Sequence, residues 1–173
     1  MMPRMNTSVV RRILITGMSG TGKSSVIARL AGLGYPAIDA DDPEYSAEVT
    51  VSAGELTGIG PGRDWVWREA AIRSALDRPD PILFISGCSP NQGDFYPSLT
   101  HIILLTASPT VIRERLRTRT TNAFGKDPGE LERALLLQTE IEPLLRRSAT
   151  HVINTRIPLD EVVAEVLRVS GVD

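Results

Sequence analysis

Residues 17–24 read Gly-Met-Ser-Gly-Thr-Gly-Lys-Ser, and this octet decides the fold of the 173-residue chain. It matches the pattern G-x-x-x-x-G-K-[ST], in which glycines let the backbone curl until its N–H groups point at phosphate oxygens. The lysine reaches the terminal phosphates, and the following hydroxyl takes one position on Mg²⁺. The octet therefore predicts a nucleoside triphosphate site, whose expected contacts are Gly17, Ser19, Gly20, Thr21, Gly22, Lys23, Ser24 and Ser25.

The sequence on either side of the octet supports this interpretation. Residues 13–15 form the short apolar run of a strand buried on both faces. After the octet, apolar residues recur at helical spacing, and Gly34 is placed to cap the end of that helix. Strand, loop and helix thus follow in the order that the motif requires. The apolar stripe of the helix consists of Val26, Ile27, Leu30 and Leu33.

Composition indicates one domain of moderate size. The chain is 42% hydrophobic and carries 19 basic against 21 acidic residues, a net charge of −2, which argues against a nucleic-acid partner. The single cysteine, Cys88, excludes an internal disulfide, and no apolar run has the length of a signal or membrane segment. We expect a loose segment at 1–8, one domain at 9–173, a cytoplasmic location, no membrane partner, and a monomer or weak homodimer.

Alternation of short apolar runs with helical periodicity predicts an α/β fold with three layers, α/β/α, around a five-stranded parallel sheet. Helices are expected at 64–76, at 109–119 after the cap Ser108, and at 159–169. A long helix should start at Asp127 with a capping box and kink or end at Pro143. The expected strands are 12–16, 36–39, 82–86, 102–106 and 151–154.

Four arginines alternate at the end of the third expected helix. The helical period places Arg115 and Arg119 on the inward side, whereas Arg113 and Arg117 fall on the opposite side. Inward arginines need anionic partners, and bound phosphates suit the planar guanidinium. The alternative is that both reach solvent or pair with structural carboxylates. The following segment, about 118–128, lacks an apolar pattern and is typical of a mobile lid that excludes water.

Acidic residues follow the second expected strand, where ligands of open parallel sheets bind. Asp39 is the candidate Mg²⁺ ligand together with Ser24, because the third strand ends in Ser86-Gly87 without the aspartate that many such ATPases use. Asp41 is the candidate base for an acceptor hydroxyl, with a role in a turn as the alternative.

Residues 58–68 contain three glycines, two tryptophans and two arginines. We expect the acceptor to bind in a region of about 41–75, with Arg63 or Arg68 gripping an anionic group, an indole stacking on a ring, and Gly87 nearby. The equally weighted alternative has the tryptophans in the core and the arginines in solvent. Cys88 is expected to be a packing residue and His101 to begin a strand.

With these motifs in place, the chain resembles the shikimate kinase and nucleoside-monophosphate-kinase branch of the phosphate-loop fold over most of 11–170. Glu114-Arg115-Leu116 followed by Arg119 is similar to the lid entry of small adenylate-kinase-like proteins. The resemblance implies phosphate or adenine contacts for both arginines. The tail 143–155 is similar to that of shikimate kinases, where the loop after the last strand cups adenine. This implies adenine contacts for Asn154, Thr155 and Arg156.

The chain departs from shikimate kinases where their acceptor binds. Ile141 stands where they place a carboxylate-binding arginine, Ser86-Gly87-Cys88 replaces a triple glycine, and Ala71 replaces a glutamate three residues after the counterpart Arg68. Shikimate is therefore not the expected acceptor. The overall pattern is most similar to small bacterial AAA-type ATP-binding proteins grouped as broad-specificity nucleotide kinases.

The leading hypothesis is an ATP- and Mg²⁺-dependent kinase for a small acceptor, either a nucleoside monophosphate or a hydroxylated metabolite. Lys23, Arg115 and Arg119 would stabilise the transferring group, and Asp41 would deprotonate or orient the acceptor. Two alternatives stay open: a nucleotide-dependent switch or slow ATPase that acts through a protein partner, and an antibiotic-modifying phosphotransferase.

Overall fold

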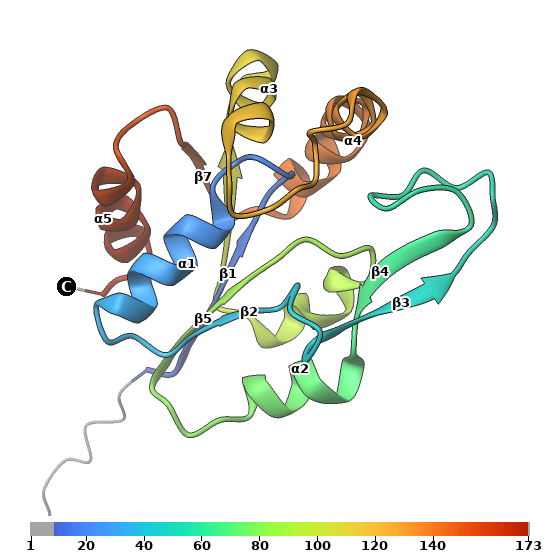
Figure 1. Cartoon of the computed structure of the whole chain (residues 1–173). Helices are drawn as coiled ribbons and strands as arrows, with labels where there is room; N and C mark the ends of the chain where they lie inside the picture. The colour runs from blue at the N-terminus through green and yellow to red at the C-terminus, as the bar shows by residue number, and fades with distance from the viewer. Residues whose placement is uncertain (1–8, 173) are drawn as a thin grey trace, which may run out of the picture.

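A parallel sheet forms the centre of the computed structural model, which describes residues 9–172 (Figure 1). All five expected strands are present, in the order β2-β5-β1-β6-β7, and every neighbouring pair is parallel. The expectation of a loose segment at 1–8 lies outside the described residues. The strands are β1 Arg11–Thr16, β2 Ala37–Asp39, β5 Ile82–Ser86, β6 His101–Thr106 and β7 His151–Asn154.

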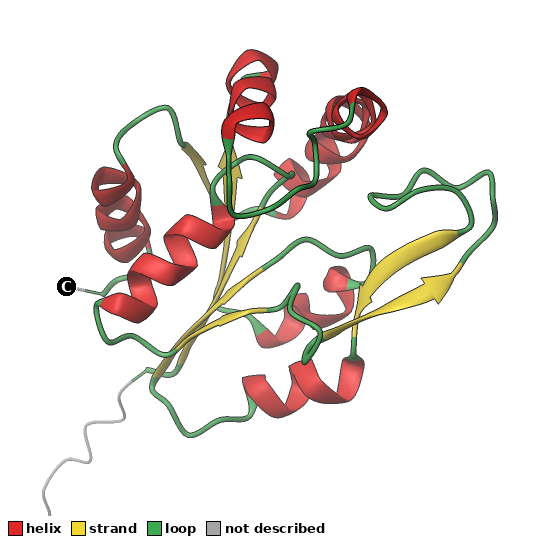
Figure 2. Ribbon diagram, in the orientation of Figure 1, coloured by secondary structure: helices red, strands yellow, loops and turns green. Residues whose placement is uncertain are grey.

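Helices cover both faces of this sheet, which confirms the three-layer prediction (Figure 2). On one face, Ile13 and Ile15 pack with α1 (Lys23–Gly32) and α5 (Leu159–Val169). On the other, Leu14 packs with α2 (Glu69–Leu76) and the 3₁₀ segment η1 (Gln92–Ser98). Leu104 on that same face packs with α4 (Pro128–Ser148). Within residues 9–172, no helix has both the length and the apolarity to cross a bilayer.

The caps of two helices form as expected, and of the two alternatives at Pro143, a kink or an end, the structure excludes the end. The Ser108 hydroxyl accepts a hydrogen bond from the Val111 N–H at the start of α3 (Pro109–Thr118). Asp127 accepts from the N–H groups of Gly129 and Glu130 at the start of α4. Pro143 does not end α4, which continues to Ser148. Burial of Leu145 after the proline helps to offset the lost backbone hydrogen bond.

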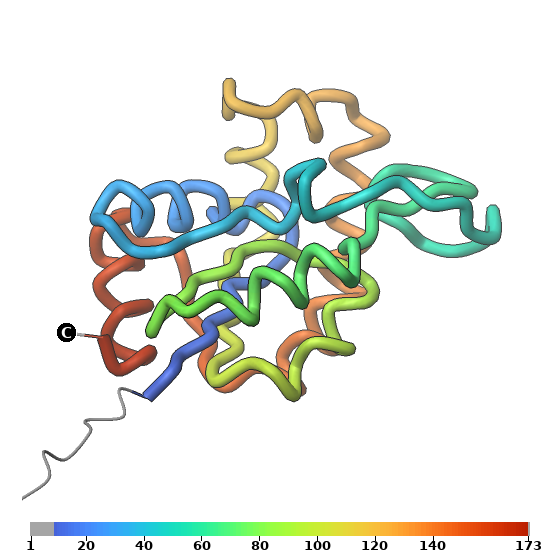
Figure 3. Tube along the Cα trace, turned by 90° about the horizontal axis from the view of Figure 1, so that it is seen from below, coloured from blue at the N-terminus to red at the C-terminus, as the bar shows by residue number. Residues whose placement is uncertain are grey.

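The expected helix 64–76 is wrong in its first part. Residues Arg63–Trp67 form β4, which pairs antiparallel with β3 (Ser46–Thr50), and only Glu69–Leu76 is helical. The run Trp65-Val66-Trp67 favours a strand, and Trp67 is buried with its ring centroid 5.8 Å from that of Phe95. The β3–β4 ribbon projects away from the central sheet (Figures 1 and 3).

Candidate nucleotide and acceptor site

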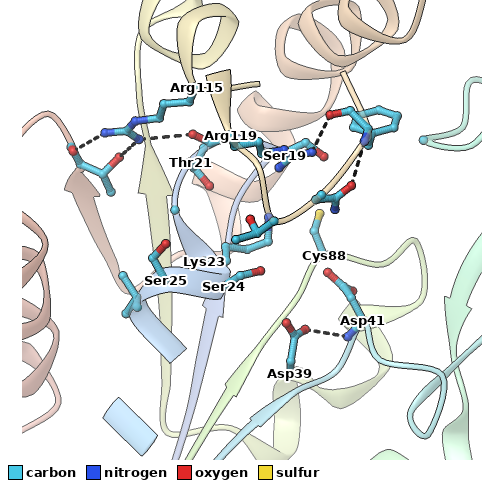
Figure 4. A pocket seen from close by; sticks show the side chains of 18 of the residues that line it. Ser19, Thr21, Lys23, Ser24, Ser25, Asp39, Asp41, Cys88, Arg115 and Arg119 are labelled. Carbon is cyan, nitrogen blue, oxygen red and sulfur yellow. Dashed lines mark hydrogen bonds between the residues drawn. The ribbon is translucent and has the colours of Figure 1, made fainter. Parts of the chain in front are cut away.

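A cavity of about 940 Å³ lies beyond the carboxyl ends of the central strands. The loop after β1, the end of β2, the loops after β5 and β7, the α3 arginines and the β3–β4 ribbon all contribute to its wall. This is where ligands bind in open parallel sheets. Figure 4 shows the residues of this site, with Arg115 and Arg119 on one side of the loop and Asp39 and Asp41 on the other.

The phosphate loop has the backbone that its glycines predict. Gly17, Gly20 and Gly22 all have positive φ, and a Cβ on Gly17 would lie 2.5 Å from the Leu105 carbonyl oxygen. Helix α1 begins directly after Gly22 with no capping side chain and no acidic residue in its first turn. Its first N–H groups therefore have no intrahelical partner and are available to an anion.

Lys23 and Ser24 lie in the middle of the cavity wall. The Lys23 ammonium donates to the carbonyls of Gly17 at 2.7 Å and Met18 at 3.1 Å, which leaves one of its three hydrogens for a phosphate. Ser24 is exposed to the cavity. Both groups lie close enough to Asp39 to lower the pKa of its carboxyl.

The residues present fit a Mg²⁺ ion that is also held by phosphates. One Asp39 oxygen accepts from the Asp41 N–H at 3.0 Å. Burial raises the pKa of Asp39 and outweighs the lowering by this hydrogen bond, Lys23 and Ser24. The described residues contain no cluster of three His, Cys, Asp or Glu side chains able to hold a metal. One carboxylate and one hydroxyl are instead the donor set of a nucleotide-bound Mg²⁺, which takes its other ligands from phosphates and water.

Asp41 is the most unusual acidic group of the site. Within residues 9–172, its buried Oδ1 atom has no hydrogen-bond partner of good geometry, although the Trp67 indole N–H and the Cys88 backbone N–H lie close enough to lower the pKa of the carboxyl. Burial raises the pKa of the carboxyl above its usual value; the positive charge of Lys23 lowers it, and the negative charge of Asp39 raises it further. A carboxylate with a raised pKa beside an open cavity is suited to accept a proton.

Gly87 supports Asp41 and is not part of the cavity wall. A Cβ on Gly87 would lie 2.9 Å from Asp41 Oδ1 and 3.1 Å from the Trp67 ring. The expectation that Gly87 contacts the acceptor is therefore not supported, because its missing side chain makes room for Asp41 instead.

Arg115 and Arg119 point inward as predicted, and both line the cavity. Arg115 donates to the Gly20 carbonyl and to both the carbonyl and the hydroxyl of Thr155. Arg119 donates to the Phe124 carbonyl, and its Nε is buried without a partner. Burial lowers the pKa of both guanidinium groups, which still keep their charge at neutral pH. Neither arginine pairs with a carboxylate, in contrast to the structural alternative.

The segment between α3 and α4 lies over the cavity, as expected for a lid. It contains no helix or strand, and Thr121, Asn122 and Phe124 line the cavity. Phe124 was not anticipated from the sequence, because an isolated aromatic residue in a polar stretch gives no periodic signal. The mobility of this segment stays a prediction.

The β3–β4 ribbon provides the far wall, and its two tryptophans differ in role. Trp65 lines the cavity, with its Nε1 donating to the Asp41 carbonyl at 3.0 Å, whereas Trp67 belongs to the core. Gly58 and Ile59 line the cavity from the ribbon loop. Ile59 was missed, because one apolar residue among glycines has no pattern that separates it from a solvent-exposed one.

Neither candidate acceptor arginine reaches the cavity wall. Arg63 is exposed and pairs with Glu48 at 3.0 Å on the ribbon. The Arg68 Nε donates to the carbonyls of Ser46 at 3.1 Å and Pro43 at 3.3 Å. The strand that replaces the expected helix explains this. Because β4 is extended, Arg63 at its start and Arg68 directly after its end lie farther along the chain direction from Trp65 than they would in a helix.

The opposite end of the cavity lies at the loop after β7. Thr155 is buried there and lines the cavity, but Asn154 and Arg156 do not. The Asn154 side chain accepts from the Arg156 N–H at 2.9 Å, which stabilises the turn. The apolar residues Ile157, Leu159 and Val162 form this wall instead. Sequence reasoning chose polar residues and missed this surface, although the loop itself was predicted.

Cys88 and His101 have the roles expected of them. Cys88 lines the cavity and also packs against the core cluster of Met18 and Leu137. Burial raises the pKa of its thiol, so it stays protonated at neutral pH. His101 is the first residue of β6.

Comparisons with known proteins show the family and the fold of the chain. The profile of the AAA domain family matches residues 13–138, so the chain belongs to this family. A nucleotide-binding protein of Acidiphilium cryptum is 26% identical over 84% of this chain. The matched region covers only 44% of the length of that relative. A shikimate kinase of Geobacter metallireducens is 29% identical over 92% of this chain and 91% of its own length.

The fold is similar to that of a shikimate kinase from Acinetobacter baumannii solved in complex with shikimate. The two structures superpose with a TM-score of 0.62 and 16% identity, over 96% of both chains. Together the comparisons confirm the expected resemblance to the phosphate-loop small-molecule kinase branch.

Proposed function

We propose that this protein transfers the γ-phosphoryl group of ATP to the hydroxyl of a small acceptor, with Mg²⁺ bound beside the phosphates. The observation that carries the proposal is the set of hydrogen-bond partners of three cations on the cavity wall. Lys23, Arg115 and Arg119 donate to backbone carbonyls or the Thr155 hydroxyl, and none of them forms a salt bridge with any residue of 9–172. Three cations without a salt bridge around a phosphate loop are suited to a polyphosphate.

The nucleotide would lie along the loop from α5 toward β2. The adenine would pack against Ile157 and Leu159, and the phosphates would take the N–H groups at the start of α1. Ser24 and Asp39 would hold Mg²⁺, which when bound neutralises charge on the phosphate oxygens. Arg115 would clamp the nucleotide because it already joins the phosphate loop to Thr155.

Arg119 and Asp41 would complete the reaction site. Arg119 has a free buried Nε next to the lid, so it would stabilise the transferring phosphoryl group once the lid closes over it. Asp41 would accept the proton of the acceptor hydroxyl. Because the arginines come from the same chain, no partner has to supply one, which favours a kinase over a switch that depends on a partner.

A transfer assay tests the proposal. The protein is incubated with γ-labelled ATP, Mg²⁺ and a panel of nucleoside monophosphates, sugars, sugar acids and aminoglycosides, with Lys23→Ala as the control. We expect label on at least one acceptor, dependent on Mg²⁺ and lost in the control. ATP binding that depends on Lys23, together with label released only as inorganic phosphate, would contradict the kinase proposal and support an ATPase.

A further inference from the structure

Charge is distributed unevenly along the cavity. The three cations that line it, Lys23, Arg115 and Arg119, come from the phosphate loop, from α3 and from the residue that caps the end of α3. All three acidic residues that line it, Asp39, Asp41 and Asp42, come from the end of β2. Figure 4 shows this separation, with the arginines across the loop from Asp39 and Asp41.

The wall beyond Asp41 is acidic and apolar. Asp42, Ile59, Trp65 and Cys88 line it together with Asp41. Within residues 9–172, the only cations on the whole cavity wall are the three at the phosphate end. An acceptor placed for attack by its hydroxyl would therefore meet two carboxylates, a thiol that stays protonated and apolar side chains, with no cation to pair with an anionic group.

Three described arginines lie near this wall without lining the cavity. Arg63 pairs with Glu48, and Arg68 donates to the carbonyls of Pro43 and Ser46. Arg133 of α4 packs beside Gly60 but does not line the cavity. Anionic acceptors are recognised by arginines that point into the pocket, and within residues 9–172 no arginine lines this wall to select a carboxylate or phosphate.

Trp65 gives the wall a fixed aromatic surface. Its indole N–H donates to the Asp41 carbonyl at 3.0 Å, and its backbone N–H donates to the Asp64 carboxylate at 2.8 Å. The bond from the indole N–H holds the ring beside Asp41, and the rest of the indole is available for packing. A ring compound with an apolar face could lie on the indole and present a hydroxyl to Asp41.

We propose that the acceptor is an uncharged polyhydroxylated molecule, a sugar-like polyol or a nucleoside, and not a carboxylate or a phosphate ester. This inference rests on the proposed function and specifies its substrate class. The acceptor oxygen forms a bond to the γ-phosphorus, the bond from that phosphorus to the β–γ bridging oxygen breaks, and the hydroxyl proton passes to Asp41. The products are a phosphate monoester and ADP.

The test uses pairs of acceptors that differ in one anionic group. Glucitol is compared with gluconate, methyl shikimate with shikimate, and adenosine with AMP, each with γ-labelled ATP and Mg²⁺. We expect kcat/KM for the uncharged member of the accepted pair to exceed that for the anionic member at least tenfold. A tenfold preference for the anionic members would overturn this inference and leave the kinase proposal standing. Label on no member of any pair or of the broader panel would overturn both.

A charge-insertion variant tests the wall itself. Ile59→Arg adds a cation to the acceptor wall, and Leu56→Arg adds the same cation three residues earlier, at a side chain that is exposed and outside the cavity. We expect Ile59→Arg to raise the ratio of anionic to uncharged kcat/KM at least tenfold, chiefly through KM, and Leu56→Arg to leave it unchanged. An equal ratio in both variants would show that the acceptor does not contact this wall and would overturn the inference.

Discussion

The two ends of the cavity are built from the chain in different ways. The phosphate end consists of one continuous segment, 17–24, and two arginines one helical turn apart on α3. The acceptor end brings together the end of β2, the ribbon loop at 58–59, Trp65 and Cys88, which no short segment contains. Phosphate binding is thus encoded locally, whereas acceptor binding depends on how distant segments pack.

This difference separates phosphate binding, a general property, from the choice of acceptor, a specific one. Backbone N–H groups and arginines bind phosphates in the same way in many proteins, so the local motif is sufficient. The proposed acceptor wall depends instead on the β3–β4 ribbon, which contributes the Trp65 side chain that contacts Asp41. We expect variants at the phosphate end to abolish transfer to every acceptor, and variants at the acceptor end to change which acceptor is used.

The largest expected effect is at the phosphate end. Arg119→Ala should lower kcat by about 10³-fold with little change in ATP affinity, because its role is to stabilise the transferring group. Arg117→Ala is the matched control, two residues away on the exposed side of α3. The measurement is single-turnover transfer together with ATP titration. An equal change in kcat in the two variants would show that Arg119 has no catalytic role beyond that of the exposed Arg117.

Loss of the base at the acceptor end should have the next largest effect. Asp41→Asn should lower kcat by about 10²-fold, because no carboxylate is left to accept the hydroxyl proton. The same variant should raise the melting temperature at neutral pH, since it removes a buried charge with an unpartnered oxygen. Asp94→Asn, at an exposed residue of η1, is the control. A variant with unchanged kcat would give Asp41 a structural role only.

The two ends should also differ in their response to pH. Burial raises the pKa of Asp41 above 3.8, so kcat should fall as pH falls through this raised pKa, by up to tenfold per pH unit. The free energy of unfolding should change with pH in the opposite direction to kcat. Asp41 ionises at a lower pH in the unfolded chain than in the folded one, so the free energy of unfolding falls as pH rises from 3.8 through the raised pKa. ATP affinity measured over the same range should change much less. An acid limb that persists in Asp41→Asn would assign this titration to another group.

The smallest effect is expected outside both ends. Arg63→Ala should change transfer less than twofold and lower stability by at most about 1 kcal/mol, because it removes only an exposed ion pair with Glu48. Steady-state kinetics and thermal unfolding measure this. A rise in the KM of an anionic acceptor would return Arg63 to the acceptor site and contradict the uncharged-acceptor inference.

The sequence predicts most of the fold because the relevant signals are local. Apolar runs fixed all five strands of the central sheet, and Ser108 and Asp127 cap their helices as expected. The helical period also placed Arg115 and Arg119 correctly. Residues 63–67 were assigned to a helix because their strand character depends on pairing with β3, which leaves no local trace beyond the aromatic and β-branched residues.

The same reasoning explains which site residues were missed. Ile59, Phe124 and the apolar wall after β7 acquire their place only through tertiary packing. Polar candidates such as Asn154 and Arg68 matched the expected chemistry, but their side chains bind nearby backbone groups instead. A chemically suitable side chain near a predicted site does not establish that it faces the site.

The central claim is that the triphosphate at the loop end is attacked by an acceptor hydroxyl held near Asp41. The most direct measurement is a single-turnover experiment with γ-labelled ATP and Mg²⁺ that quantifies label on the accepted alcohol and label released as phosphate. We predict that most label goes to the alcohol in the wild-type protein and that Asp41→Asn lowers this share. Label appearing only as phosphate, with the acceptor present and ATP bound, would contradict the account.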